Sequence, residues 1–278
     1  MTATTLALIV GGGSFGAGVL GALTGLGGGI VIVPMLTLVF GVDLKYAIGA
    51  SLVSVIATSS GAAAAYVREG FTNVRVGILL EVATTMGALM GAALAGIIPN
   101  PWLAVLFGAL LLFTAYRSMH GRTDHDVLTT PDIWSVRLRL DSTYPTATGK
   151  QPYSVQRAPA GFALMFVAGI LSALLGIGSG IIKVIAMDQL MRLPFKVSTT
   201  TSNFMIGVTA AAGAGVMLHR GQIDPLLAFP VTLGVLCGAL VGSRMLGSAN
   251  PVRLRQLFTA VVVLMGIEML YRGLTRTI

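Results

Sequence analysis

The segment Gly18-Val-Leu-Gly-Ala-Leu-Thr-Gly-Leu-Gly-Gly-Gly-Ile30 recurs 151 residues later as Gly169-Ile-Leu-Ser-Ala-Leu-Leu-Gly-Ile-Gly-Ser-Gly-Ile181. The same register, without a gap, aligns further pairs of residues: Lys45 with Lys196, Ser51 with Ser202, Thr58 with Thr209, and Gly70 with Gly221. Because polar residues as well as glycines keep this register, we interpret the chain as an internal repeat. Repeats of this kind are typical of membrane transporters.

The sequence around these motifs is strongly apolar. Of the 278 residues, 55% are hydrophobic and only 10% are charged, whereas soluble domains carry about 25% charged residues. This composition excludes a soluble globular domain, a nucleic-acid binder and a disordered tail. A helix that spans a bilayer needs about 20 apolar residues, and we expect apolar helices over 6–24, 28–40, 46–67, 76–98, 101–118, 159–175, 180–191, 198–218, 225–247 and 254–272.

Two of these segments, 28–40 and 180–191, are too short to cross the bilayer comfortably. Each follows a glycine-rich break, so we interpret them as half-helices near the midplane of the membrane. The sequence therefore predicts an all-α polytopic membrane protein with two inverted repeats of about four to five helical segments each.

One long polar stretch, 118–158, separates a first transmembrane repeat, 1–117, from a second, 159–278. Within this loop Val136, Leu138 and Leu140 alternate with polar residues, which is typical of a short strand, and we expect them to form a β-hairpin with 152–157. At the other end of the sequence, the first residues lack a basic region, and we expect a mature membrane segment rather than a cleaved signal.

The basic residues predict the orientation of the protein. The formal net charge is +8, and inverted repeats place 13 Lys and Arg on the side of the 118–158 loop and four on the other side. Parallel repeats give 11 against six. Because basic residues collect in cytoplasmic loops, we expect inverted repeats in the cell inner membrane, with the 118–158 loop in the cytoplasm and both termini outside.

The two glycine-rich breaks are the first candidate binding site. Glycine allows backbone N–H groups to approach a ligand, and the start of the following helix carries unpaired N–H donors and the positive end of a dipole. We expect the breaks to meet and to bind an anion through Gly27, Gly28, Gly29, Gly178, Ser179 and Gly180. The alternative is that these glycines only allow helices to pack closely.

The heads of both halves carry the pattern G-x-L-x-x-L-x-G-[LI]-G-x-G, followed by AIGASLVSVIATS (47–59) and STTTSNFMIGVT (198–209). In these motifs the chain resembles the sulfite exporter TauE/SafE family, also called the toluene-sulfonate uptake permease family. The resemblance covers both repeats and all but the 118–158 loop. It implies a prokaryotic inner-membrane transporter of small sulfur-containing anions, such as sulfite or organosulfonates. Pro34 is matched by Ile185 in the second half, which departs from strict equivalence of the half-helices.

Polar side chains after the breaks are candidates to orient such an anion. Ser51 and Thr58, like Ser202 and Thr209, are seven residues apart and share one helical face. With these hydroxyls, we expect Thr199 and Asn203 to donate hydrogen bonds to sulfonate oxygens. The alternative is that the hydroxyls join helices or bond to carbonyls of their own helix. Asn203 is the strongest candidate, because hydrocarbon offers an amide no partner.

Ionisable residues at membrane depth are costly and mark functional sites. Lys183, three residues after the second break, is the side chain that we expect first to bind the anion. Its alternative role is a structural ion pair with Asp188 or Glu81. Glu81 is the candidate for carrying a coupling proton, and its alternative is a place at the headgroup boundary.

The residues indicate no enzyme. The three histidines, His120, His125 and His219, lack metal-ligand spacing and a nearby nucleophile, and Cys237 is single. We expect no cofactor and no metal. The partners we expect are a small anionic substrate and the lipid bilayer, and a homodimer is one candidate assembly. The predicted function is secondary transport by alternating access; the alternatives are a passive anion channel and a non-transport membrane assembly subunit.

Overall fold

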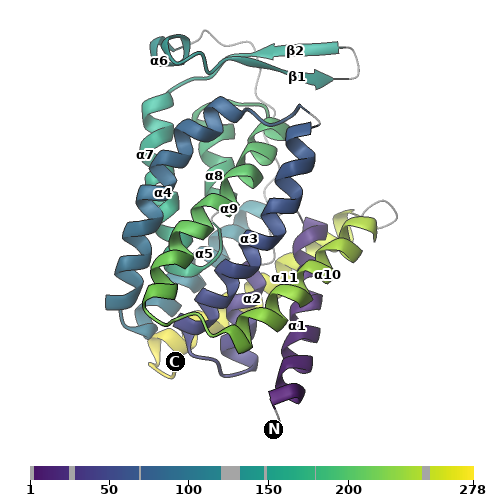
Figure 1. Ribbon diagram of the computed structural model, residues 1–278, viewed down its shortest axis with the longest axis vertical. Coiled ribbons are helices and arrows are strands. Elements are labelled where there is room, and N and C mark those ends of the chain that lie inside the picture. The colour runs from purple at the N-terminus through teal and green to yellow at the C-terminus, as the bar shows by residue number, and fades with distance from the viewer. Residues whose placement is uncertain are drawn as a thin grey trace.

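The computed structural model describes residues 3–24, 29–68, 70–119, 132–146, 149–178, 180–245 and 251–278 (Figure 1). The first half contains α1 (Ala3–Thr24), α2 (Gly29–Pro34) continued by a π-helical turn η1 (Met35–Val39), α3 (Leu44–Arg68), α4 (Val74–Ile97) and α5 (Asn100–Met119). The second half contains α7 (Ala158–Leu175), α8 (Gly180–Ile185) continued by η2 (Ala186–Leu190), α9 (Phe195–His219), α10 (Pro225–Met245) and α11 (Pro251–Leu274). Between the halves lie α6 (Ile133–Arg137), β1 (Ser142–Thr146) and β2 (Gly149–Tyr153).

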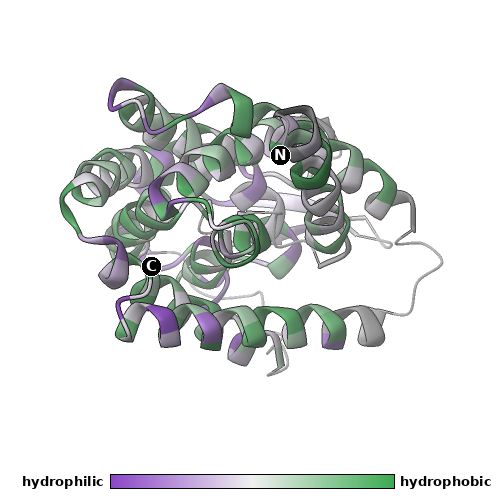
Figure 2. Ribbon diagram, turned by 90° about the horizontal axis from the view of Figure 1, so that it is seen from below, coloured by the Kyte–Doolittle hydropathy of each residue, from purple (hydrophilic) through white to green (hydrophobic). Residues whose placement is uncertain are grey.

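Every segment expected to be an apolar helix is helical where the structure describes it, so the prediction of an all-α polytopic membrane protein is confirmed; residues 28, 246 and 247 of the expected segments lie outside the described residues. Within the described residues, 6 helices are long and apolar enough to cross a membrane. Their large apolar side chains also point outward, as Ile78 (59% exposed) and Val82 (53% exposed) do on α4. Figure 2 shows hydrophobic residues on helices all around the molecule. Such an outer surface requires lipid, because water would penalise it.

The helices recur at the interval of the sequence repeat. Gly29 and Gly180, which begin α2 and α8, are 151 residues apart, and the same interval separates the first residues of α3 and α9, of α4 and α10, and of α5 and α11. The π-helical turns η1 and η2 follow the same spacing. The two glycine-broken segments are short helices, as the sequence indicates.

The main helix contacts also follow the repeat: two pairs join equivalent helices, and the two other pairs are equivalent to each other. α3 packs against α9 and α5 against α11, while α1 lies along α10 and α7 lies along α4. The backbone N–H of Asn73, just after α3, donates to Thr201 Oγ1 near the start of α9, with an N–O distance of 3.0 Å. At the other end, Gly49 near the start of α3 lies against the Gln222 backbone, just after α9. Equivalent helices α3 and α9 therefore run antiparallel (Figure 1). The orientation of the halves across the membrane stays a prediction.

Glycines permit the closest helix contacts. A Cβ atom added to Gly87 on α4 would lie on the Phe166 carbonyl of α7, and one added to Gly238 on α10 would lie on the Phe15 carbonyl of α1. These two contacts are equivalent at the 151-residue interval. In both halves, therefore, the same position lets two backbones touch, which is how helices associate in lipid.

This equivalence predicts matched stability losses. Gly87→Val and Gly238→Val are each expected to lower the free energy of unfolding by about 1–3 kcal/mol, because the new side chain meets backbone that cannot move aside. Thermal unfolding in detergent measures the loss. Gly16→Val and Gly215→Val are the controls, because a Cβ atom at either glycine meets nothing within 4 Å. Equal melting temperatures for all four variants would contradict the prediction.

The polar loop contains an antiparallel β-hairpin in which Ser142 pairs with Tyr153 and Thr146 with Gly149. The strand expected over 136–141 was placed wrongly, because residues 133–137 form helix α6 and a turn follows it. Leu140 faces the core (2% exposed), whereas Val136 (58%) and Leu138 (43%) are exposed. The alternating pattern therefore does not correspond to one buried face.

A buried amide fastens this extramembrane segment to the helices. Asn73 Nδ2 donates to the Leu140 carbonyl (2.9 Å) and to the Tyr153 hydroxyl (2.8 Å), and its Oδ1 accepts from the Val76 N–H at the start of α4. Burial raises the pKa of Tyr153 to about 12, so its hydroxyl stays protonated at neutral pH. These bonds hold α6 and the hairpin at one end of the helical bundle (Figure 1).

Candidate functional site

Gly29, the described end of the first glycine-rich break, lies against the second break next to α3. α7 ends at Leu175, and its C-cap Gly176 (φ 68°) and the nearby Gly178 (φ 75°) are both in the left-handed region, where glycine is favoured. A Cβ atom on Gly29 would lie 3.1 Å from the Gly176 carbonyl oxygen and 3.1 Å from Ser51 Oγ. The described part of the first break therefore contacts the second. Gly27, Gly28 and Ser179 lie outside the described residues.

The serines after the breaks donate to backbone carbonyls. Ser51 Oγ donates to the Gly176 carbonyl (2.7 Å) and Ser202 Oγ donates to the Gly180 carbonyl (3.2 Å). Both serines are buried. Their hydroxyls hold the second break against α3 and α9, so in this conformation their protons are engaged within the protein.

Thr199 and Asn203 lie one turn apart on α9 and differ in their partners. Thr199 Oγ1 donates to the Phe195 carbonyl of its own helix (2.9 Å). Asn203 is half-buried, and its amide has no hydrogen-bond partner among the described residues. Its two N–H donors are therefore available to a ligand.

Lys183 on α8 lies within a buried network that joins the two halves of the chain. Its side chain is 0% exposed, and its Nζ donates to Thr209 Oγ1 on α9 (2.5 Å). Thr209 Oγ1 is 2.8 Å from Glu81 Oε1 on α4 and 3.3 Å from Thr84 Oγ1. Thr85 Oγ1 also donates to Glu81 Oε1 (3.2 Å). A single hydroxyl thus bridges a lysine of the second half and a carboxylate of the first half.

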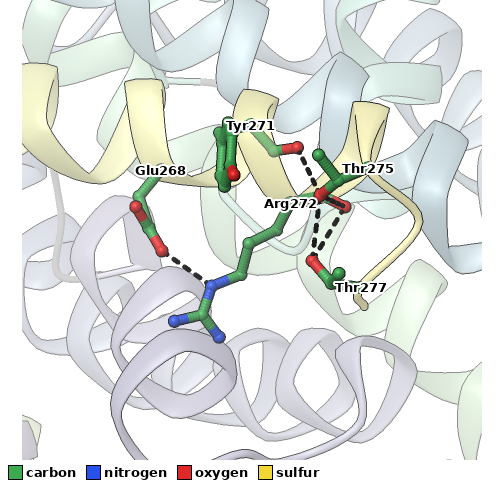
Figure 3. Close-up of polar contacts among 5 residues, drawn as sticks. All are labelled: Glu268, Tyr271, Arg272, Thr275 and Thr277. Atoms are coloured by element: carbon green, nitrogen blue, oxygen red, sulfur yellow. Dashed lines mark hydrogen bonds and ion pairs between the residues drawn. The ribbon is translucent and has the colours of Figure 1, made fainter.

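The charges of Lys183 and Glu81 interact through this hydroxyl rather than by direct contact. Within the described ranges, the direct ion pair is that of Arg272 and Glu268 on α11, where Nε and Oε1 are 2.7 Å apart (Figure 3). That pair is partly exposed, near the end of the helix. By contrast, Glu81 Oε2 is buried and has no hydrogen-bond partner in the described part of the chain. This oxygen can hold a proton without breaking an existing bond.

The charged network, which takes residues from both halves, has a neutral counterpart at the positions related by the repeat. At the 151-residue interval, Lys183 corresponds to Ile32, Glu81 to Thr232 and Thr209 to Thr58. Ile32 is buried, and Thr58 donates to the Ser54 carbonyl of its own helix. The repeat therefore contains one ionisable centre and one neutral counterpart.

The sequence paired Lys183 with Asp188 or Glu81 only as the alternative to anion binding, and the structure brings Lys183 and Glu81 together through Thr209. It separates Lys183 from Asn203, because Asn203 lies about 100° around α9 from Ser202, which faces α8. Thr84 and Thr85 were missed by sequence reasoning. The signal was their spacing, three and four residues after Glu81, which places them on its helical face.

Comparisons with known proteins agree with this architecture. Residues 10–269 match the model of the family described as sulfite exporter TauE/SafE. The probable membrane transporter protein YunE of Bacillus subtilis is 27% identical over 266 residues, covering 93% of this chain and 95% of the relative. The probable membrane transporter protein MJ0441 of Methanocaldococcus jannaschii is 25% identical over 281 residues, covering 95% and 94%. No solved structure matches the chain significantly.

These relatives are named as membrane transporters, which is consistent with the expectation that the chain is not an enzyme. The match to the family model runs from the first helix to the last and includes both glycine-rich breaks. With its apolar spans, the protein is a multi-pass membrane protein. A family match over so much of the chain, together with repeated helices around a buried ionisable centre, places this protein in the TauE/SafE family of membrane transporters.

Proposed function

We propose that this protein is a secondary transporter of small sulfur-containing anions, sulfite or organosulfonates, which works by alternating access of its two halves and is coupled to protons through Glu81. The observation that carries the proposal is the buried bridge from Lys183 through Thr209 to Glu81. The name of the family favours export as the direction.

The bridge supports coupling because it joins side chains of both halves. Moving the halves relative to each other separates Lys183 from Glu81, and a charge that loses its buried partner is strongly destabilised. Protonation of Glu81 removes the penalty for its own carboxylate, with Oε2 as the available position for the proton. The protonation state of Glu81 then biases which arrangement of the halves is stable, which is the requirement for coupling.

Asn203 and the glycine-rich breaks support an anion site next to this network. The unpartnered amide of Asn203 offers two donors, and Ile206, one turn later on α9, packs on Gly178. Sulfite and sulfonates present three oxygens that accept hydrogen bonds, and such bonds to charged acceptors are the stronger ones. Lys183 faces another side of α9 from Asn203, and it adds a positive charge to α8, three residues after Gly180.

Flux into proteoliposomes tests the proposed function. The substrates are sulfite and methanesulfonate, measured with and without an imposed pH gradient, and acetate and protein-free liposomes are the controls. Accumulation against the anion gradient that collapses with the pH gradient is the expected result. Flux that only runs down the anion gradient would instead identify a passive channel. Flux no faster than in protein-free liposomes would indicate a non-transport membrane subunit.

Asn203→Ala is expected to raise the KM for methanesulfonate by about tenfold or more, because a hydrogen bond to a charged group is worth about 1.5–3 kcal/mol. Its melting temperature should stay that of the wild type, since the amide has no partner among the described residues. Thr199→Val is the matched comparison, because its hydroxyl is bonded to the Phe195 carbonyl. A KM that changes more in Thr199→Val than in Asn203→Ala would exclude Asn203 as the anion ligand.

A further inference from the structure

The extramembrane helix α6 and the residue that follows it expose apolar side chains, which are not covered by the described part of the bundle. Ile133 is 81% exposed, Val136 58%, Trp134 49% and Leu138 43%. These residues are consecutive or nearly so, and they lie outside the membrane-spanning helices. An exposed apolar cluster of this kind marks a surface that meets another apolar phase.

The orientation of α6 is fixed by contacts on its other side. Ser135 is buried, and the N–H of Leu140 donates to the Ser135 carbonyl (2.9 Å). Leu140 is itself buried, and its carbonyl accepts from Asn73 Nδ2. α6 also packs against α7. The exposed side chains therefore point outward because the opposite side of the segment is anchored.

Three arginines surround the apolar cluster. The Arg137 guanidinium lies 6.0 Å from the centre of the Trp134 ring, and the Arg75 Nη1 donates to the Arg139 carbonyl (3.1 Å). All three arginine side chains are exposed, and within the described residues none of them forms an ion pair with a carboxylate. Their positive charges are therefore available to an anionic partner.

The cluster continues the lipid-facing surface of the bundle. Arg75 is the second residue of α4, whose exposed stripe starts at Val74 (38%) and continues through Ile78 (59%) and Val82 (53%). Figure 1 shows α6 beyond the ends of α4 and α7, at the edge of the bundle rather than over its centre.

We propose that α6 is an interfacial anchor for anionic phospholipid: Ile133, Trp134, Val136 and Leu138 insert at the bilayer surface, and Arg75, Arg137 and Arg139 bind the headgroups. Tryptophan favours the boundary between hydrocarbon and water. Basic residues beside an apolar helical face attract anionic lipid, with a contribution of about fivefold in partitioning for each residue. If a partner protein bound here instead, its surface would have to supply carboxylates to the three arginines, and it would exclude lipid from Trp134.

The chain offers a direct test because it has only two tryptophans. Trp102, at the start of α5, is 63% exposed, so Trp102→Phe should keep the fold; it leaves Trp134 as the single tryptophan. This variant is placed in nanodiscs of phosphatidylcholine, with or without phosphatidylglycerol, that contain lipids brominated at shallow or deep positions of the acyl chain. We expect shallow bromines to quench Trp134 more than deep ones, and phosphatidylglycerol to increase the quenching.

Substitution of all three arginines, R75Q/R137Q/R139Q, should remove the increase caused by phosphatidylglycerol. Lys150→Gln is the matched control, since this exposed lysine lies beside the hairpin turn, away from α6. The melting temperature of each variant checks that the fold is kept, and the single change R137Q serves if the triple variant unfolds. Absent quenching of Trp134, or quenching that does not depend on phosphatidylglycerol, would overturn the proposal.

Discussion

Lys183→Met is expected to abolish transport and to lower the free energy of unfolding by about 3–5 kcal/mol, which is the usual result of removing one partner of a buried charge pair. The Lys183 side chain is 0% exposed and donates to Thr209, which bridges it to Glu81. Methionine keeps most of the volume but removes the charge, so Glu81 loses its compensation. Transport in proteoliposomes and thermal unfolding in detergent measure the two effects.

A second substitution separates stability from function. In the double variant Lys183→Met/Glu81→Gln both charges are absent, and replacing a whole buried pair by neutral groups is often neutral or stabilising. We expect the melting temperature to return to near that of the wild type while transport stays absent. Arg272→Gln is the control on the partly exposed pair with Glu268, where the loss should be below about 1 kcal/mol. Wild-type transport by Lys183→Met would refute an essential role of this lysine.

Glu81→Gln is expected to eliminate accumulation driven by a pH gradient while exchange of the anion across the membrane continues. Glutamine has the shape of glutamate and keeps an oxygen that accepts from Thr209 and Thr85, but it cannot exchange a proton. With one proton per anion, the wild type should accumulate substrate about tenfold for each unit of pH gradient. The variant should reach only the external concentration.

The repeat supplies a matched control for this prediction. Thr232 stands at the position that corresponds to Glu81 in the second half, and its Oγ1 is buried without a partner among the described residues. Thr232→Val should therefore keep both coupling and stability, since it removes a hydroxyl that forms no bond there. If Glu81→Gln still accumulated substrate under a pH gradient, Glu81 would not be the coupling residue.

Local sequence patterns were sufficient to predict the membrane helices, but they did not predict the short elements outside the membrane correctly. A segment of apolar residues in lipid forms a helix because its backbone must be hydrogen-bonded within the segment. The polar loop lies outside that constraint. There the spacing of Val136, Leu138 and Leu140 fits a strand, but so short a run of residues is compatible with the period of a strand and with that of a helix. The contacts that anchor Ser135 and Leu140 selected a helix followed by a turn.

The candidate site divides in the same way. The amino-acid sequence by itself determined the membrane-spanning helices, the repeat at 151 residues and the paired glycine-rich breaks. It also identified Lys183 and Glu81 as candidates, because ionisable residues are rare in the apolar segments. All of these follow from composition and spacing along one chain. Only the tertiary structure decided that Thr209 joins Lys183 to Glu81 and that Asn203 stays without a partner among the described residues. The physical reason is that Lys183 and Glu81 meet through the packing of α4 against α7 and α9, which depends on backbone approach at positions such as Gly87, and local periodicity does not specify it.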